Sequence, residues 1–275
     1  MLRQILPFGL ALLLLMGTAV AATEAVNPLP LSCFVIHCEP TKASEASFLA
    51  LTDLVEQATA AAVPLTIDFT AQWAEMILAS EEKLSAVTQW LADGHEIGCH
   101  HHPYWSTQSR TATWDGYTDT PASEIDPAES FRYRGTMADY MALLDALPGE
   151  RITACMGLED ERDAIDWPCQ IVYSTVGQSI DDAVSTPYES VLNECSSWQV
   201  THSLLLAQEP GALQALYRAT PSTSVFCVVG HVYNFVEDPQ PFVVWLGFLA
   251  GSDAEAVYRG TVSQIIERWF LENPS

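Results

Sequence analysis

Short apolar runs alternate with helix-patterned segments, and this alternation constrains the fold more than any other feature of the chain. Cys33–His37 and Pro64–Phe69 are runs of strand length, and the first is almost wholly apolar. Between them, apolar residues recur at helical spacing from Leu51 to Ala58, after Ser44, which can cap a helix. Strands covered on both faces and separated by helices are typical of parallel sheets. The pattern therefore predicts an α/β fold, either a parallel barrel or a doubly wound sheet.

The alternation continues along the chain. Leu84, Val87 and Leu91 mark a helix that ends at Gly94, and a third strand follows at Glu96–His100. Further strands are expected at 152–155, 171–173, 198–201, 224–229 and 257–258, and further helices at 126–147, near 242–249 and after the capping sequence that begins at 261.

The first 21 residues have the layout of a signal peptide. Arg3 supplies a positive charge, residues 5–16 are mostly apolar, and Ala19 and Ala21 are the small residues that a signal peptidase reads. The apolar run is shorter than the roughly 20 residues needed to span a bilayer. We therefore expect the mature chain to begin near Ala22 and to work in the periplasm or outside the cell.

The formal charge of -24 argues against nucleic acid and anionic lipid as partners, because a phosphate-binding face needs clustered Lys and Arg. Seven cysteines in an exported chain allow disulfides, with at least one thiol left over. Their spacing contains no C-x-x-C pair, which argues against a finger-type zinc module. Cys155 with Cys169 and Cys195 with Cys227 are the pairings considered.

Four ionisable residues stand at the ends of four predicted strands, namely Glu39, Asp68, His100 and His231. In a parallel barrel, active residues lie where strands end and loops begin. This placement is the main reason to expect a functional site at that end of the sheet.

The triplet His100–His101–His102 predicts a metal site. On an extended segment, His100 and His102 point to one side and His101 to the other. Two imidazoles and a carboxylate suit Zn²⁺ or a similar divalent ion, with positions left open for water. Glu39 is the natural carboxylate. The alternatives are a solvated histidine-rich turn and, for Glu39, an ordinary loop acid.

Three more residues carry two interpretations each. His231 follows a buried strand, where it either transfers a proton near neutral pH or has a structural role. Asp68 acts as a base, or it caps the helix that begins near Thr70, and we favour the cap. His37 shares a strand face with Glu39, and we favour a core histidine bonded to backbone.

A long loop from Pro103 to about Ile125 is rich in aromatic residues. Trp105, Trp114 and Tyr117 offer flat faces to sugar rings, or they pack on the rim of the barrel. The chain has no G-x-S-x-G elbow for a serine hydrolase and no glycine-rich phosphate loop. A glycosidase that uses two carboxylates is an alternative that the sequence leaves open.

Residues Gly94–His100, which read GHEIGCH, resemble the second motif of the polysaccharide deacetylases with a NodB homology domain. Val228–His231 resembles the last motif of that family, and Ile36–Glu39 occupies the place of its first. The resemblance implies a distorted (β/α) barrel of seven or eight strands over residues 22–275. It also implies His100 as a metal ligand, Glu39 in place of the ligand aspartate, and His231 as the general acid.

The sequence departs from the family pattern at two positions. The second ligand histidine of the family falls at Tyr104, so we choose His102 on geometry. The catalytic base of the family falls at Cys38, which cannot serve in the same way. Candidates for the middle motifs are Arg134 and Asp166–Trp167.

The resemblance implies a hydrolase that uses a divalent metal to remove N- or O-acetyl groups from a polysaccharide or other glycan. The histidine and glutamate ligands indicate that this metal is Zn²⁺. His231 and Asp68 are the candidate catalytic residues. Glycan contacts are expected at Trp105, Trp114, Tyr117 and Arg134. The alternatives are an inactive carbohydrate-binding protein, because of Cys38, and a glycoside hydrolase on a related barrel.

Overall fold

A computed structural model describes residues 28–105, 113–156, 160–177, 179–205 and 210–274. The expected signal peptide, residues 1–21, lies outside this described part. Within it, no helix has both the length and the apolar character needed to cross a membrane.

The first half of the chain forms the alternating units that the sequence predicts, in the order β1 (Leu31–Cys38), α1 (Glu45–Ala60), β2 (Leu65–Phe69), α2 (Ala71–Leu78), α3 (Glu81–Ala92) and β3 (Glu96–His101). Ser44 caps α1 by accepting a hydrogen bond from the Ser47 backbone N–H at 3.2 Å. Gly94 follows the C-terminus of α3 and has φ +93°, a left-handed conformation that glycine adopts at low cost.

The second half contributes the remaining strands, which are β4 (Thr153–Met156), β5 (Tyr173–Val176), β6 (Val184–Ser185), β7 (Tyr188–Leu192), β8 (Cys195–Thr201), β9 (Ser203–Leu204) and β10 (Val225–His231). Its helices are α4 (Met137–Asp145), α5 (Pro210–Ala219), α6 (Val232–Glu237), α7 (Gln240–Ser252) and α8 (Val262–Glu272).

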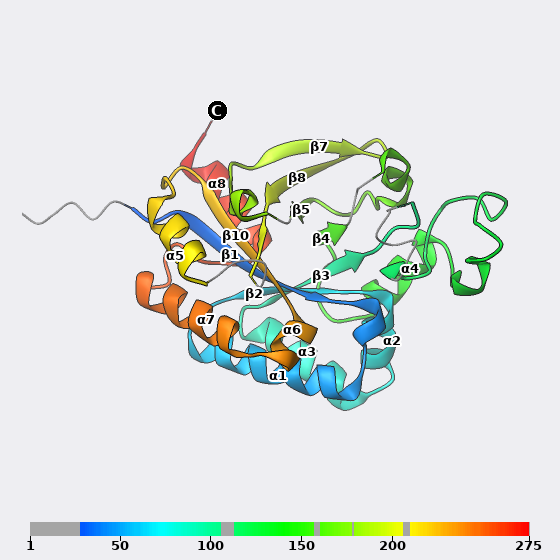
Figure 1. Ribbon diagram of the computed structural model, residues 1–275, viewed down its shortest axis with the longest axis horizontal. Helices are drawn as coiled ribbons and strands as arrows, with labels where there is room; N and C mark the ends of the chain where they lie inside the picture. Colours follow the sequence, from blue (N-terminus) through cyan, green and yellow to red (C-terminus); the bar gives the residue numbers. More distant parts are fainter. Residues whose placement is uncertain (1–27, 106–112, 157–159, 178, 206–209, 275) are drawn as a thin grey trace, which may run out of the picture.

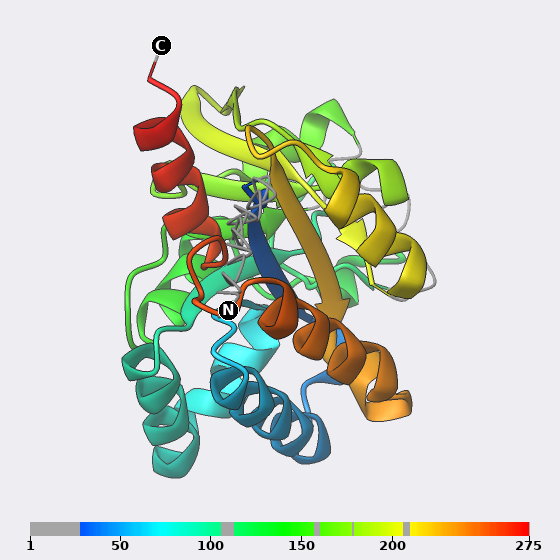
Figure 2. The same ribbon diagram turned by 90° about the vertical axis from the view of Figure 1, so that its left-hand side faces the viewer.

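One curled sheet holds all of these strands, in the order β6-β10-β1-β2-β3-β4-β5-β8-β7, with β9 paired to β10. From β10 to β8, each neighbouring pair is parallel. In Figure 2, β1 (blue) and β10 (gold) run side by side. Because β8 leads directly into β9, which lies against β10, the two ends of this parallel wall approach each other. The distorted (β/α) barrel implied by the resemblance is thus confirmed, in the form of a half-barrel.

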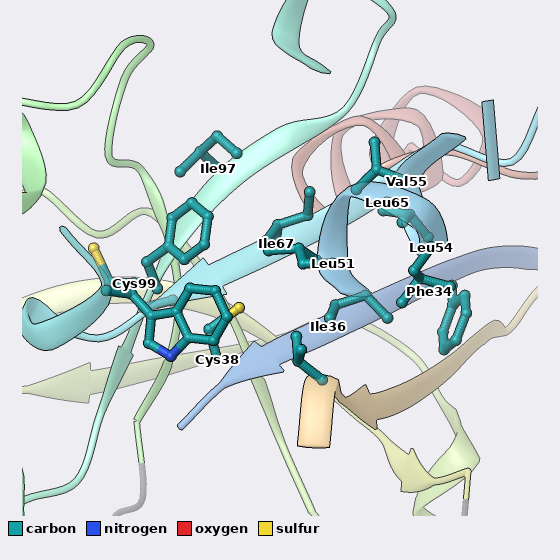
Figure 3. Close-up of a cluster of buried hydrophobic side chains, with 14 of the residues drawn as sticks. Phe34, Ile36, Cys38, Leu51, Leu54, Val55, Leu65, Ile67, Ile97 and Cys99 are labelled. Carbon is teal, nitrogen blue, oxygen red and sulfur yellow. The ribbon is translucent and has the colours of Figure 1, made fainter. Parts of the chain in front are cut away.

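The two faces of β1 pack against different partners. Phe34, Ile36 and Cys38 face the layer of helices, where they meet side chains of α1 such as Leu51 and Leu54 (Figure 3). This helical layer includes α1, α2, α3, α6 and α7 and covers one side of the sheet (Figure 1). The alternate residues of β1 belong to a second apolar cluster, inside the curl, that α8 completes. Every residue of β1 is buried, as expected of a strand covered on both faces.

Two element predictions were wrong. The helix expected to begin at Asp126 begins at Met137, because the effective capping box is Thr136 with Asp139, whose side chain and backbone N–H groups bond reciprocally. The strand expected at 257–258 is absent, and this segment makes only an isolated bridge from Ser32 to Arg259.

The cysteine pairings considered from the sequence were also wrong. The disulfide joins Cys169 to Cys195, whose Cα atoms are 5.0 Å apart. Cys155 lies on β4 and Cys227 on β10, and both are buried thiols. Their strands are separated from each other in the sheet by β1, β2 and β3.

Candidate metal centre at the mouth of the barrel

The carboxyl ends of β1, β3 and β10 meet at one edge of the sheet. Glu39 follows β1, His100 lies near the end of β3 with His102 just beyond it, and His231 ends β10. In the ladder between β1 and β10, His37 is paired with His231, which brings Glu39 next to the latter. The sequence placed Glu39, His100 and His231 at strand ends and His102 beside them on geometry, and the parallel sheet brings all four together.

The four side chains converge on the Glu39 carboxylate. Its Oε1 lies 3.3 Å from His100 Nε2 and 3.3 Å from His231 Nε2. Its Oε2 lies 3.0 Å from His102 Nε2. The Nε2 atoms of His100 and His102 are 2.8 Å apart, and their rings are nearly perpendicular at 86°. Glu39, His100 and His102 thus form a group whose ligand atoms all lie within 4.8 Å of one another.

The hydrogen bonding of His100 shows that this group suits a cation. His100 Nδ1 donates to the Cys155 carbonyl oxygen at 3.0 Å, because a carbonyl can only accept. In a neutral ring, Nε2 then carries a lone pair, and this lone pair faces the carboxylate and the Nε2 of His102. Burial lowers the pKa of His100, which favours that neutral form. A divalent cation between these atoms would satisfy all three, with a carbonyl orienting the ligand ring from behind.

Glu39 is the negative charge of the centre. Burial alone would raise its pKa, but the three imidazoles around it, those of His100, His102 and His231, together hold the pKa well below its ordinary range. The carboxylate is therefore ionised and able to act as a metal ligand at neutral pH.

A second donor group lies deeper and comprises His37, His100 and Cys155. Its geometry does not suit one ion, because the His37 and His100 rings stack at 4.1 Å with an interplanar angle of 23°. The lone pairs of stacked imidazoles lie in nearly parallel planes and do not converge on a common point. Glu39, His100 and His102 are therefore the better candidate for a cation site.

Asp68 and His37 lie inside the barrel, one layer beneath the mouth. Asp68 is fully buried, and burial raises its pKa well above the ordinary value. It does not cap α2, because Thr70 holds the N-cap position and neither carboxylate oxygen of Asp68 has a hydrogen-bond partner within the described residues. His37 Nε2, 3.8 Å from Asp68, is likewise unpartnered there. The favoured interpretation of Asp68 as a helix cap was wrong, whereas His37 is a buried core histidine, as expected.

His101 points away from the mouth, as strand alternation predicts, but its role was not foreseen. Its Nδ1 donates to Asp115 at 2.7 Å and its Nε2 to Asp166 at 3.4 Å. Burial would lower the pKa of His101, but these two carboxylates raise it to about 10. Asp166 also accepts hydrogen bonds from the Thr118 hydroxyl and the Asp119 backbone N–H. No local motif marks this set, because its members come together only through the fold of the loop.

The aromatic loop packs largely on the barrel rim. Trp114 and Tyr117 are 4 % and 3 % exposed, so of the two alternatives left by the sequence they pack on the rim and do not offer open faces to a sugar. Trp105 is half-buried and lines a groove with Tyr104 and residues 123–127, while the Arg162 guanidinium lies 3.7 Å over its ring.

Two other candidates have structural partners. Arg134 pairs with Glu75 at 2.9 Å and lines a groove beside the centre. Cys38, at the position where the family has its base, is wholly buried among apolar side chains facing the helices (Figure 3). Trp167, the second residue of the middle-motif candidate Asp166–Trp167, is buried, with 2 % of its surface exposed.

No family model and no curated protein matches the sequence. Among solved structures, a protein from Pseudomonas aeruginosa described as a polysaccharide deacetylase aligns with a TM-score of 0.55 at 16% identity, over 89% of this chain and 92% of that one. A protein from Mycobacterium smegmatis that is described in the same way aligns with a TM-score of 0.54 at 13% identity, over 90% of this chain and 93% of that one. An allantoinase aligns with a TM-score of 0.54 at 15% identity, over 89% of this chain and 91% of that one.

These alignments extend over most of each chain at identities too low to carry more than the fold. The protein therefore has the half-barrel fold of structures described as polysaccharide deacetylases and an allantoinase, with a candidate His and Glu metal group at the mouth of the barrel and a sequence that marks it as a divergent example.

Proposed function

We propose that this protein is a divergent polysaccharide deacetylase, a metal-dependent hydrolase that removes N- or O-acetyl groups from a glycan. The observation that carries the proposal is the convergence of His100 Nε2, His102 Nε2 and the Glu39 carboxylate at the mouth, with His231 Nε2 3.3 Å from the same carboxylate. The fold shared with proteins described as deacetylases supports it.

The residues of the chain have distinct parts in this reaction. A divalent cation held by Glu39, His100 and His102, Zn²⁺ by the donor set, would supply Lewis-acid polarisation of the acetyl carbonyl. His231 holds a proton beside the centre and delivers it to the departing nitrogen or oxygen. Overall, the acyl carbon gains the oxygen of water, the C–N or C–O bond breaks, and the leaving group takes the proton.

Metal analysis together with acetate release tests this proposal. The purified protein should contain about one equivalent of a divalent metal and release acetate from an acetylated glycan. His100→Ala and His102→Ala should lose both. Bound metal without acetate release from chitin-like, peptidoglycan-like and exopolysaccharide substrates would contradict it.

One observation favours a second candidate, a carbohydrate-binding protein without catalysis. Cys38 stands where the family has its base, and its side chain is buried away from the mouth. Burial also raises the pKa of the Cys38 thiol, so it does not act as a base at neutral pH. Glycan binding without turnover, unaffected by chelators, would select this candidate. Release of reducing ends instead of acetate would select a glycoside hydrolase.

We also propose that the protein is exported to the periplasm or the cell exterior. The signal-like segment at residues 1–21 and the Cys169–Cys195 disulfide support this, since disulfides persist in oxidising compartments. N-terminal sequencing of the protein recovered after cell fractionation should begin near Ala22. A chain that begins at Met1 in the cytoplasmic fraction would contradict the proposal.

A further inference from the structure

Three adjacent parallel strands place His231, His37 and Asp68 in one row across the sheet. His37 on β1 is paired in register with His231 on β10 on one side and with Asp68 on β2 on the other. The row continues on β3 with Gly98, where an added Cβ atom would overlap Asp68 Oδ1. The absence of a side chain at Gly98 therefore leaves room for the buried Asp68 carboxyl group, and His37 lies between this group and the mouth.

The His37 ring lies against other imidazole rings. It stacks on His100 with the ring centroids 4.1 Å apart and an interplanar angle of 23°. His231 and His202 meet it edge-on, with their centroids 5.2 Å and 5.7 Å away. Its Nε2 lies 3.8 Å from Asp68 Oδ2. Because the interior is closely packed on these sides, the ring of His37, which is 3% exposed, has little freedom to turn.

Two contacts orient the ring of His100. Its Nδ1 donates a hydrogen bond to the Cys155 carbonyl oxygen. A single hydrogen bond tolerates a tilt of roughly 30°, because it weakens steeply only when the donor angle falls below about 120°. The stacked His37 ring covers one face of His100 and so limits that tilt. The placement of His100 Nε2, 3.3 Å from Glu39 Oε1, therefore depends on His37 as well as on the carbonyl.

His37 also restricts His231. The ring of His231 contacts His37 at an interplanar angle of 88° and Tyr233 at 5.1 Å between centroids. Its Nε2 lies 3.3 Å from Glu39 Oε1, the same oxygen atom that His100 faces. One buried ring thus supports both of the histidines that face this oxygen.

We propose that His37 is a positioning residue of the metal centre, whose flat ring holds His100 and His231 in the orientation that directs their Nε2 atoms to Glu39. His37 acts through these two histidines and contacts neither metal nor substrate. This inference rests on the proposed function, because it takes His100 as a metal ligand and His231 as the acid.

A matched pair of substitutions separates the ring of His37 from its other properties. His37→Phe keeps a flat ring and His37→Leu fills the buried space without one, while both remove the nitrogen atom near Asp68. In competition with a chromophoric chelator, His37→Leu should bind Zn²⁺ about tenfold more weakly than the wild type, and His37→Phe should stay within about threefold. The control, His95→Leu, removes an imidazole that is also buried but lies away from the centre, and it should leave the affinity unchanged.

A second measurement uses NMR of the metal-free protein. The ring current of His37 should shift the carbon-bound ring protons of His100 upfield, because the two rings are stacked. This shift should be lost in His37→Leu and retained in His37→Phe. A general loss of stability would not produce that pattern.

Equal Zn²⁺ affinities of His37→Leu and His37→Phe would overturn the positioning role, as would the absence of the upfield shift in the wild type. Failure of the proposed function would instead appear in the wild type as bound Zn²⁺ without acetate release. That result together with a difference between the Leu and Phe variants supports the positioning role and contradicts the hydrolase. Acetate release by the wild type together with equal affinities of the two variants does the reverse. A wild type that binds no Zn²⁺ would contradict both.

Discussion

Three consecutive histidines occupy two contrasting environments in this protein. His100 and His102 face the mouth of the barrel, where their Nε2 atoms approach each other to 2.8 Å and share one carboxylate. His101 faces the loop on the other side, where both of its nitrogens donate to carboxylates of their own. The mouth brings acceptor atoms together, whereas the His101 cluster pairs donors with acceptors.

This difference separates a candidate cation site from a cluster that already contains a positive charge. At the mouth, the Nε2 lone pair of neutral His100 faces an ionised carboxylate, and a metal would balance them. Around His101, the protonated ring donates to both Asp115 and Asp166 and offsets one of their two negative charges, which holds the loop against β3. Each of the following changes tests that distinction.

The largest expected effect is on folding. His101→Leu leaves Asp115 and Asp166 buried without their counter-charge and should lower the free energy of unfolding by about 3–5 kcal/mol. His102→Leu, one residue along and 19% exposed at its side chain, should change it by less than about 1 kcal/mol. Urea unfolding of the metal-free proteins measures both. Equal losses would break the comparison.

The same cluster should make stability depend on pH. The pKa of His101 is raised to about 10 from a reference value of 6.5. Its contribution to stability is therefore present in full below about pH 6.5 and is lost as pH rises towards 10. Unfolding of the wild type between pH 6 and 10 should show this loss, and His101→Leu should not. Parallel profiles for the two proteins would exclude the charged form of His101.

Substitutions at the mouth of the barrel should change the affinity of the protein for a metal ion. His100→Ala removes a ligand and should weaken Zn²⁺ binding more than about 100-fold, since outer-shell changes alone cost 10- to 100-fold. The control is His95→Asn, because His95 bonds to Thr59 and the Leu65 backbone N–H, away from the centre. Competition with a chromophoric chelator measures both affinities. Unchanged affinity in His100→Ala would remove the metal assignment.

The smallest expected effect concerns Asp68, which belongs to neither region. Because Asp68 is fully buried beneath the mouth, we expect Asp68→Asn to lower kcat/KM for acetate release less than about threefold. Glu39→Gln should lower it far more, since it removes the charged ligand. A loss in Asp68→Asn as large as that in Glu39→Gln would make Asp68 part of the catalytic apparatus.

Local patterns predicted the first half of the fold well. The apolar runs of β1 and β2, the Ser44 cap and the Gly94 stop act over a few residues and are legible in the sequence. The second half was predicted less accurately. The hairpin of β7 and β8 was only partly expected, and the start of α4 was placed too early because Asp126–Pro127 has a cap-like composition without forming a helix.

The candidate site divides in the same way. Strand-end placement predicted that Glu39, His100 and His231 would lie together, and alternation predicted that His101 would point away from His102. The pairing of His101 with Asp166 could not be predicted, because 65 residues separate them and no local rule relates the two.

The sequence alone determined the α/β class and the residues that end the strands, because burial on both faces and the period of two along a strand are local properties. The tertiary structure decided which of those residues share a site. It sent Asp68 into the interior, turned Cys38 towards the helices and covered Trp114, while leaving Phe131 exposed. The physical reason is that convergence depends on sheet curl, strand order and loop packing, which are sums over many distant contacts and not a property of any short segment.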